Sequence, residues 1–191
     1  MAGKIRVDWK KVWSEAPTTW LQLKKDFSHS NPAQNLCHFE KSVYVIRLDG
    51  PFCVQYYRKS SPVLYIGSGH LQQRVTSHLE WINDLSKRLD DLAFELWVLK
   101  PRVRKAHDAY KSVEGRLLSD FVLEHGSLPY FNKNKKKENR VFDYDNIRNL
   151  RSAILIGSGK RFTWALTPMS REPTYNSYRK GFDVGEKHTK T

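Results

Sequence analysis

The stretch SVYVIRL, residues 42–48, decides the fold, because its side chains follow the two-residue period of a β-strand. It ends at the turn pair Asp49-Gly50, and CVQYYR, residues 53–58, follows as the expected hairpin partner. A third strand is expected at residues 63–66, VLYI, directly after Ser60-Ser61-Pro62. The main part of the chain is therefore expected to begin with hairpin-connected β-strands.

A helix, a strand and a second helix are expected next. Apolar side chains recur at helical spacing from Leu71 to Leu89, and AFELWVL, residues 93–99, predicts a strand that stops before Pro101. A long helix is expected from about residue 104 to residue 125, with Gly126 at its C-terminal stop. This order predicts an α/β (α+β) fold: a small, largely antiparallel central sheet flanked by helices.

The N-terminal part is expected to be helical. Trp9, Val12 and Trp13 lie at helical spacing, and Pro17 interrupts the pattern before it resumes at Trp20. Residues 1–30 are therefore expected to form a pair of short helices, followed by turn-forming residues.

The C-terminal part carries weaker signals. Modest strands are expected at 153–156 and 162–166, and a polar tail follows from Ser170 onward. We therefore divide the chain into an N-terminal helical extension (1–38), a core (39–138) and a C-terminal extension with a polar tail (139–191).

Composition favours a folded intracellular protein. The 191 residues are 39% hydrophobic, and no apolar run approaches the roughly 18 residues that would span a bilayer. The first residues lack the apolar segment of a secretory signal, so we expect an intracellular location, in the cytoplasm or nucleoid. Two cysteines, Cys37 and Cys53, exclude a disulfide-stapled scaffold and form no CxxC metal motif.

The charge balance indicates an anionic partner. Thirty-three Lys and Arg residues against 20 Asp and Glu leave a formal net charge of +13. Membrane surfaces, acidic proteins and nucleic acids all carry the opposite charge. The aromatic content of 13% and the lack of a long basic amphipathic helix favour nucleic acid.

Three polar residues lie within the apolar stripes of the expected helices. Glu114 stands beside Leu117 in the long helix, while Arg74 and His78 are four residues apart in the preceding one. A buried charge is costly unless it is paired or holds a metal. Two interpretations explain this pattern. One is a half-buried Arg-Glu salt bridge together with a core histidine, and the other is a functional site.

Together with the strands, these residues resemble the GIY-YIG nuclease superfamily. The first motif corresponds to Ser42-Val43-Tyr44 and the second to Tyr65-Ile66-Gly67. Arg74, His78, Glu114 and Asn132 match the family's helix arginine, the histidine one turn later, the metal-binding glutamate and the later asparagine. The resemblance covers about residues 42–135. Ser42 and Val43 replace the family's Gly and Ile, and residues 51–62 stand as an insertion between the two motifs.

The resemblance implies a Mg²⁺-dependent (or Mn²⁺-dependent) DNA endonuclease. A single carboxylate, Glu114, would hold one metal ion, and Arg74 would bind a phosphate oxygen. Tyr44 and Tyr65 would position the attacking water, with Tyr44 as proton acceptor once nearby cations lower its pKa. His78 would relay the proton or bind the phosphate. Asn132 would either take part in catalysis or fix the loop that leaves the long helix.

Basic residues outside this centre are expected to bind the backbone of double-stranded DNA without reading sequence. They are Arg102, Arg104, Lys105, Lys111, Lys133, Lys135, Lys136 and Lys137. Two alternatives stay open: a catalytically weak or silent nucleic-acid-binding module, and a nuclease that acts on RNA. The oligomeric state and the choice of cleavage site are also left open.

Overall fold

A four-stranded sheet forms the centre of the protein. The computed structural model describes residues 3–14, 19–31, 39–89, 92–104, 106–156, 162 and 164–167. The sheet has the order β2-β7-β3-β6, and each neighbouring pair is antiparallel. The strands are β2 (Lys10–Ser14), β7 (Ala93–Leu99), β3 (Ser42–Asp49) and β6 (Val63–Gly69). The mixed α/β class with a largely antiparallel sheet, predicted from the sequence, is confirmed.

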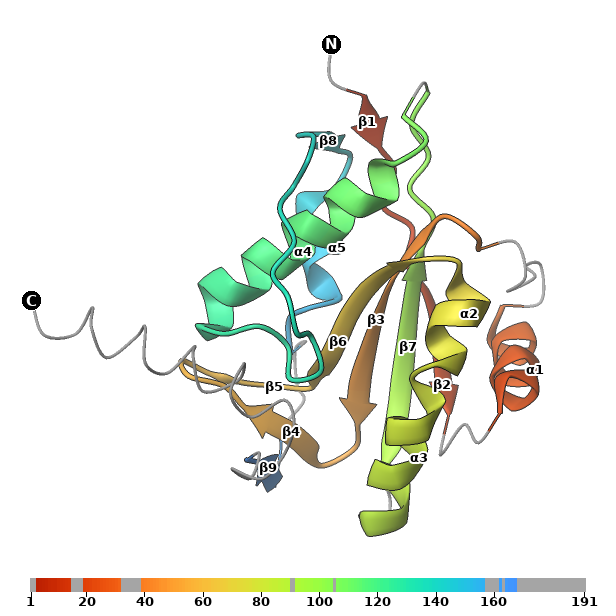
Figure 1. The fold of residues 1–191 in the computed structure, drawn as a ribbon, viewed down its shortest axis with the longest axis vertical. Coiled ribbons are helices and arrows are strands. Elements are labelled where there is room, and N and C mark those ends of the chain that lie inside the picture. The colour runs from red at the N-terminus through yellow and green to blue at the C-terminus, as the bar shows by residue number, and fades with distance from the viewer. Residues whose placement is uncertain are drawn as a thin grey trace, which may run out of the picture.

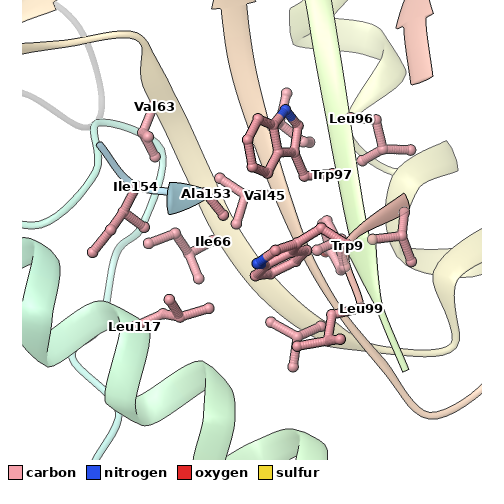
Figure 2. Close-up of a cluster of buried hydrophobic side chains, with 14 of the residues drawn as sticks. Trp9, Val45, Val63, Ile66, Leu96, Trp97, Leu99, Leu117, Ala153 and Ile154 are labelled. Atoms are coloured by element: carbon pink, nitrogen blue, oxygen red, sulfur yellow. The ribbon is translucent and has the colours of Figure 1, made fainter. Parts of the chain in front are cut away.

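Helices cover both faces of this sheet (Figure 1). On one face lie α1 (Trp20–Ser30), α2 (Leu71–Thr76) and α3 (Leu79–Arg88), and on the other lie α4 (Ala109–His125) and α5 (Ile147–Ser152). Figure 2 shows Leu117 of α4 beside Ala153, Ile154, Val45 and Ile66. Because both faces are covered, residues 42–48 of β3 are all buried.

The first of the two predicted N-terminal helices is wrong, because residues 3–14 contain no helix and residues 4–5 and 10–14 form strands. Residues 10–14 form strand β2, which pairs with the edge of β7, with Val12 opposite Leu96. Trp9 packs edge-on against Trp97, with ring centroids 6.2 Å apart. Apolar residues at spacings of three and four do not exclude a short strand, and the unpaired edge of β7 decides the outcome. The second predicted helix is confirmed as α1, capped by the Thr19 hydroxyl.

The hairpin partner of β3 also differs from its prediction. β3 pairs with β6, while β4 (Phe52–Gln55) leaves the central sheet. β4 pairs instead with β5 (Ser60–Ser61) and, in parallel, with β9 (Trp164–Leu166). The reason is that β6 and β7 already occupy both edges of β3. The segment between the two tyrosine motifs therefore forms a separate small sheet.

Three further boundaries are corrected. The helix predicted over residues 71–89 is divided into α2 and α3 at Ser77-His78. The long helix starts at Ala109 rather than near residue 104, and it ends as predicted at Gly126, which adopts a left-handed conformation (φ 83°). Residues 153–156 form a turn after α5 instead of a strand, because Ile154 and Leu155 hydrogen-bond back to Arg151.

The remaining elements are short. β1 (Lys4–Ile5) pairs in parallel with β8 (Asp143–Tyr144), so residues far apart in the chain meet beside α4. The strand predicted near the C-terminus is present as β9. Cys37, Lys105 and the polar tail from Ser170 lie outside the described residues. No helix within the described ranges is long and apolar enough to cross a membrane. The domain boundaries at 38/39 and 138/139 stay predictions.

Candidate active site

The two motif tyrosines lie side by side on the face of the sheet that α2 and α3 cover. Tyr44 of β3 and Tyr65 of β6 stack, with ring centroids 5.9 Å apart and an interplanar angle of 27°. Gly67 stands directly opposite Tyr44 in the sheet. A Cβ atom at Gly67 would lie 2.6 Å from the Tyr44 Oη, so only glycine leaves room for the buried phenol here.

His78 joins this pair from the junction between α2 and α3. Its ring lies 4.3 Å from that of Tyr65, centroid to centroid, and its Nε2 is 3.0 Å from the Tyr44 Oη. The Trp81 indole N–H donates to the His78 Nδ1 at 3.2 Å. Because an indole N–H is only a donor, Nδ1 must be unprotonated and the neutral ring carries its proton on Nε2. His78 therefore donates a hydrogen bond to the Tyr44 oxygen.

Burial and nearby charges keep His78 and Tyr44 neutral at pH 7. Burial and then the charge of Arg74 lower the pKa of His78 to about 4. Burial and then Tyr65 raise the pKa of Tyr44 above its ordinary value. The charge of Arg74 acts in the opposite direction, as expected from the sequence, but the effect of burial is larger and the net pKa of Tyr44 is raised. The Tyr44 phenol consequently keeps its proton at neutral pH.

Glu114 lies on the opposite face, on α4, with only 1% of its surface exposed. Its Oε2 accepts a hydrogen bond of 2.7 Å from the Ser68 hydroxyl. The Lys136 ammonium lies 2.8 Å from Oε1 and 3.0 Å from Oε2. The ion-pair partner of Glu114 is thus a lysine, and the Arg-Glu salt bridge considered from the sequence is not what the structure contains.

A cleft of about 460 Å³ opens above this carboxylate. Arg74 lines it from α2 and Lys111 from α4, while Lys136 and Lys137 line it from the loop after α4. Four cationic side chains surround one carboxylate that is already paired. Such a cleft has the charge to bind an anion, and a phosphodiester backbone is one such ligand.

Arg74 connects the two halves of the candidate site. It is an exposed residue of α2 that lines the cleft, and its guanidinium also interacts electrostatically with Tyr44 and Tyr65. The tyrosines and His78 do not themselves line the cleft, and Tyr44 has no exposed surface. The structure therefore brings Glu114 and Arg74 together in one cavity, while the buried Tyr44 and the half-buried Tyr65 lie outside its lining.

Asn132 serves the backbone of β6. Its Oδ1 accepts from the Ile66 N–H at 2.9 Å, and its amide nitrogen donates to the Ile66 carbonyl at 2.7 Å. The neighbouring Phe131 N–H donates to the Leu64 carbonyl. Both polar ends of the Asn132 amide are therefore occupied by the strand that carries Tyr65.

The residues predicted to bind nucleic acid divide into two groups. Lys111, Lys136 and Lys137 line the cleft. Arg102, Arg104, Lys133 and Lys135 are exposed but lie outside its lining, and Lys105 lies outside the described residues. The cleft wall therefore includes only part of the predicted basic surface.

The donor set around Glu114 suits a hard divalent cation that keeps most of its water. Within the described residues, no group of three or more His, Cys, Asp or Glu side chains is placed to enclose a metal. Glu114 and Ser68 offer oxygen atoms at the edge of a roomy cleft, and an ammonium group already occupies the cation position. One carboxylate with several retained waters is an arrangement that Mg²⁺ accepts and a soft metal would not favour.

Sequence reasoning missed Trp81, Ser68 and the pairing of Lys136. Trp81 stacks on Phe131 at 4.0 Å between centroids, which holds the indole against His78. Its position three residues after His78 places it on the same helical face, which is a signal that could have identified it. The Glu114–Lys136 contact spans 22 residues and had no local signal.

No protein-family model, curated protein or solved structure matches this chain.

Proposed function

We propose that this protein is a divalent-cation-dependent DNA endonuclease of the GIY-YIG type, which hydrolyses phosphodiester bonds at the cleft above Glu114. One observation carries the proposal: the buried Glu114 carboxylate and the Arg74 guanidinium line the same cationic cleft, and the charge of Arg74 also acts on the Tyr44–Tyr65 pair. A pure binding surface has no need for a buried carboxylate beside the bound phosphate, because the carboxylate repels it.

Substrate binding follows from the charges of the cleft. Arg74 presents a planar fork of N–H donors that fits two phosphate oxygens. Lys111 and Lys137 add positive charge at the same wall. These residues would set affinity and salt dependence without reading the base sequence.

Hydrolysis needs a proton acceptor for the attacking water. In the proposed reaction, Arg74 moves toward the bound phosphate and so opens the buried Tyr44 oxygen to the cleft, where Tyr44 acts as phenolate. The water O–H bond breaks, its proton moves to the Tyr44 oxygen, and the water oxygen bonds to phosphorus as the bond to the 3′ oxygen breaks. The departing oxygen takes a proton from solvent. A divalent cation held at Glu114 would neutralise charge that develops on the phosphoryl and departing oxygens.

His78 and Arg74 support Tyr44 in this role. The His78 Nε2–H points at the phenol oxygen, so it stabilises the phenolate rather than removing its proton. Arg74 acts in the same direction through its positive charge. Asn132 has a positioning role, because it fixes the strand that bears Tyr65.

A catalytically silent nucleic-acid-binding module is the second candidate. Lys136 already neutralises Glu114, and burial raises the pKa of Tyr44, which disfavours its phenolate at neutral pH. Both features would suit a protein that binds nucleic acid without cutting it.

Plasmid nicking distinguishes the two candidates. We expect supercoiled DNA to be cut with Mg²⁺ or Mn²⁺ and not with EDTA, and we expect Glu114→Gln to lose cutting while its DNA affinity is kept or raised. Glu124→Gln is the matched control, since Glu124 lies on the same helix and pairs with Lys59 away from the cleft. DNA binding without cation-dependent cutting would support the binding module, and cutting of RNA alone would reassign the substrate.

A further inference from the structure

Lys136 occupies the place beside Glu114 that a metal ion would need. Its ammonium contacts both carboxylate oxygens, and Oε2 also accepts from Ser68. The lysine side chain is 48% exposed, whereas the glutamate side chain is 1% exposed. The pair therefore joins a fixed anion to a cation that can leave toward solvent.

The loop that carries Lys136 is held against α4. A Cβ atom at Gly115 would collide with the Lys137 carbonyl, so the loop backbone crosses the helix in direct contact at this glycine. Farther along the loop, the Arg140 N–H donates to the Ser112 hydroxyl at 3.1 Å. These interactions set Lys136 above Glu114, which distinguishes it from a surface lysine that meets a carboxylate by chance.

Charge compensation makes the lysine necessary when no metal is bound. A carboxylate removed from water is costly unless a cation or several donors stabilise it. With Lys136 in place, a second cation at the same oxygens would meet a like charge at short range. Binding of a divalent ion at these oxygens therefore disfavours contact by Lys136.

We propose that Lys136 is the resident counter-cation of Glu114, and that a divalent cation binds by displacing it. This inference rests on the proposed metal role of Glu114 and adds the residue that sets the cation concentration at which the site fills. Lys136 and Lys137 both line the cleft, but Lys136 forms the ion pair with Glu114.

Mn²⁺ binding to the full chain tests the proposal without any measurement of activity. Free Mn²⁺ is measured by electron paramagnetic resonance for the wild type and for Lys136→Met, Lys136→Arg, Lys137→Met and Glu114→Gln. We expect Lys136→Met to bind Mn²⁺ about tenfold tighter or more, because a competing charge is removed. Lys136→Arg should stay near the wild type, Lys137→Met should change by no more than about threefold because a more distant charge is better screened, and Glu114→Gln should lose the site.

Thermal unfolding gives a second readout. Without metal, Lys136→Met leaves the buried carboxylate without its counter-charge, so its Tm should fall below that of Lys137→Met. Added Mn²⁺ should then raise the Tm of Lys136→Met more than that of the wild type, because the tighter ligand stabilises the folded state more.

The outcomes separate this inference from the proposed function. Equal Mn²⁺ affinities for wild type and Lys136→Met, with loss in Glu114→Gln, would overturn displacement and leave the metal site standing. Weaker binding by Lys136→Met would also overturn it, since Lys136 would then assist the metal. Absence of Mn²⁺ binding in every variant would overturn both displacement and the metal role of Glu114.

Discussion

Replacement of Asn132 by alanine tests whether this residue supports the fold or takes part in the reaction. The substitution removes both hydrogen bonds to Ile66, of 2.9 and 2.7 Å. Ile66 is fully buried, and water therefore has little access to its freed N–H and carbonyl groups. An unsatisfied buried polar group costs about 1–3 kcal/mol, so two of them predict a loss of about 2–6 kcal/mol in the free energy of unfolding.

Urea denaturation followed by tryptophan fluorescence measures this loss. Asn134→Ala is the matched control, because Asn134 is exposed in the same loop and should change stability by less than about 0.5 kcal/mol. A stable Asn132→Ala protein, within about 1 kcal/mol of the wild type, that has lost cleavage would refute the positioning role. Asn132 would then have to act on the substrate directly.

Three further predictions concern the proposed chemistry. Because the pKa of Tyr44 is raised, the phenolate stays a minor form at neutral pH and its fraction grows about tenfold with each pH unit. The nicking rate at saturating DNA should therefore rise about tenfold per unit between about pH 6.5 and about pH 9. A flat profile, or wild-type rates from Tyr44→Phe, would exclude Tyr44 as the proton acceptor. In ¹⁵N NMR of labelled histidine, His78 should carry its proton on Nε2, and Trp81→Phe should increase the Nδ1–H form; a protonated Nδ1 in the wild type would contradict the assignment. Binding isotherms at several salt concentrations test three exposed lysines when glutamine replaces all three. The slope of log affinity against log salt should become shallower by about 0.9 units for each DNA phosphate that a lysine no longer neutralises. An unchanged slope would mean that DNA does not contact these lysines. These lysines are Lys133, Lys135 and Lys137.

The central strands were predictable because their signals are local. Residues 42–48 and 93–99 are apolar runs bounded by turn residues or proline, and they form β3 and β7 with nearly the predicted bounds. Strand β2 was mistaken for a helix because five residues carry little periodicity. Its state depends on the edge of β7, which lies more than 75 residues away in the chain.

The candidate site was predictable in its residues and less so in their interactions. The apolar stripe around Glu114 predicts its burial, and the structure agrees. The division of the helix at Ser77-His78 was not predicted, because the stripe continues across it and no proline or glycine marks the break. The contact between Lys136 and Glu114 depends on where a loop crosses α4, which no spacing rule specifies.

The shared position of Arg74 makes the two halves of the site thermodynamically linked. The Arg74 guanidinium would stabilise negative charge on the tyrosine pair, and it also lines the cationic cleft. If a bound phosphate draws Arg74 toward itself, Arg74 stabilises the Tyr44 phenolate less. By reciprocity, formation of the phenolate weakens phosphate binding by the same free energy. In the proposed endonuclease, a gain in substrate affinity through Arg74 would therefore lower the stability of the Tyr44 phenolate, and both effects would act through a single side chain.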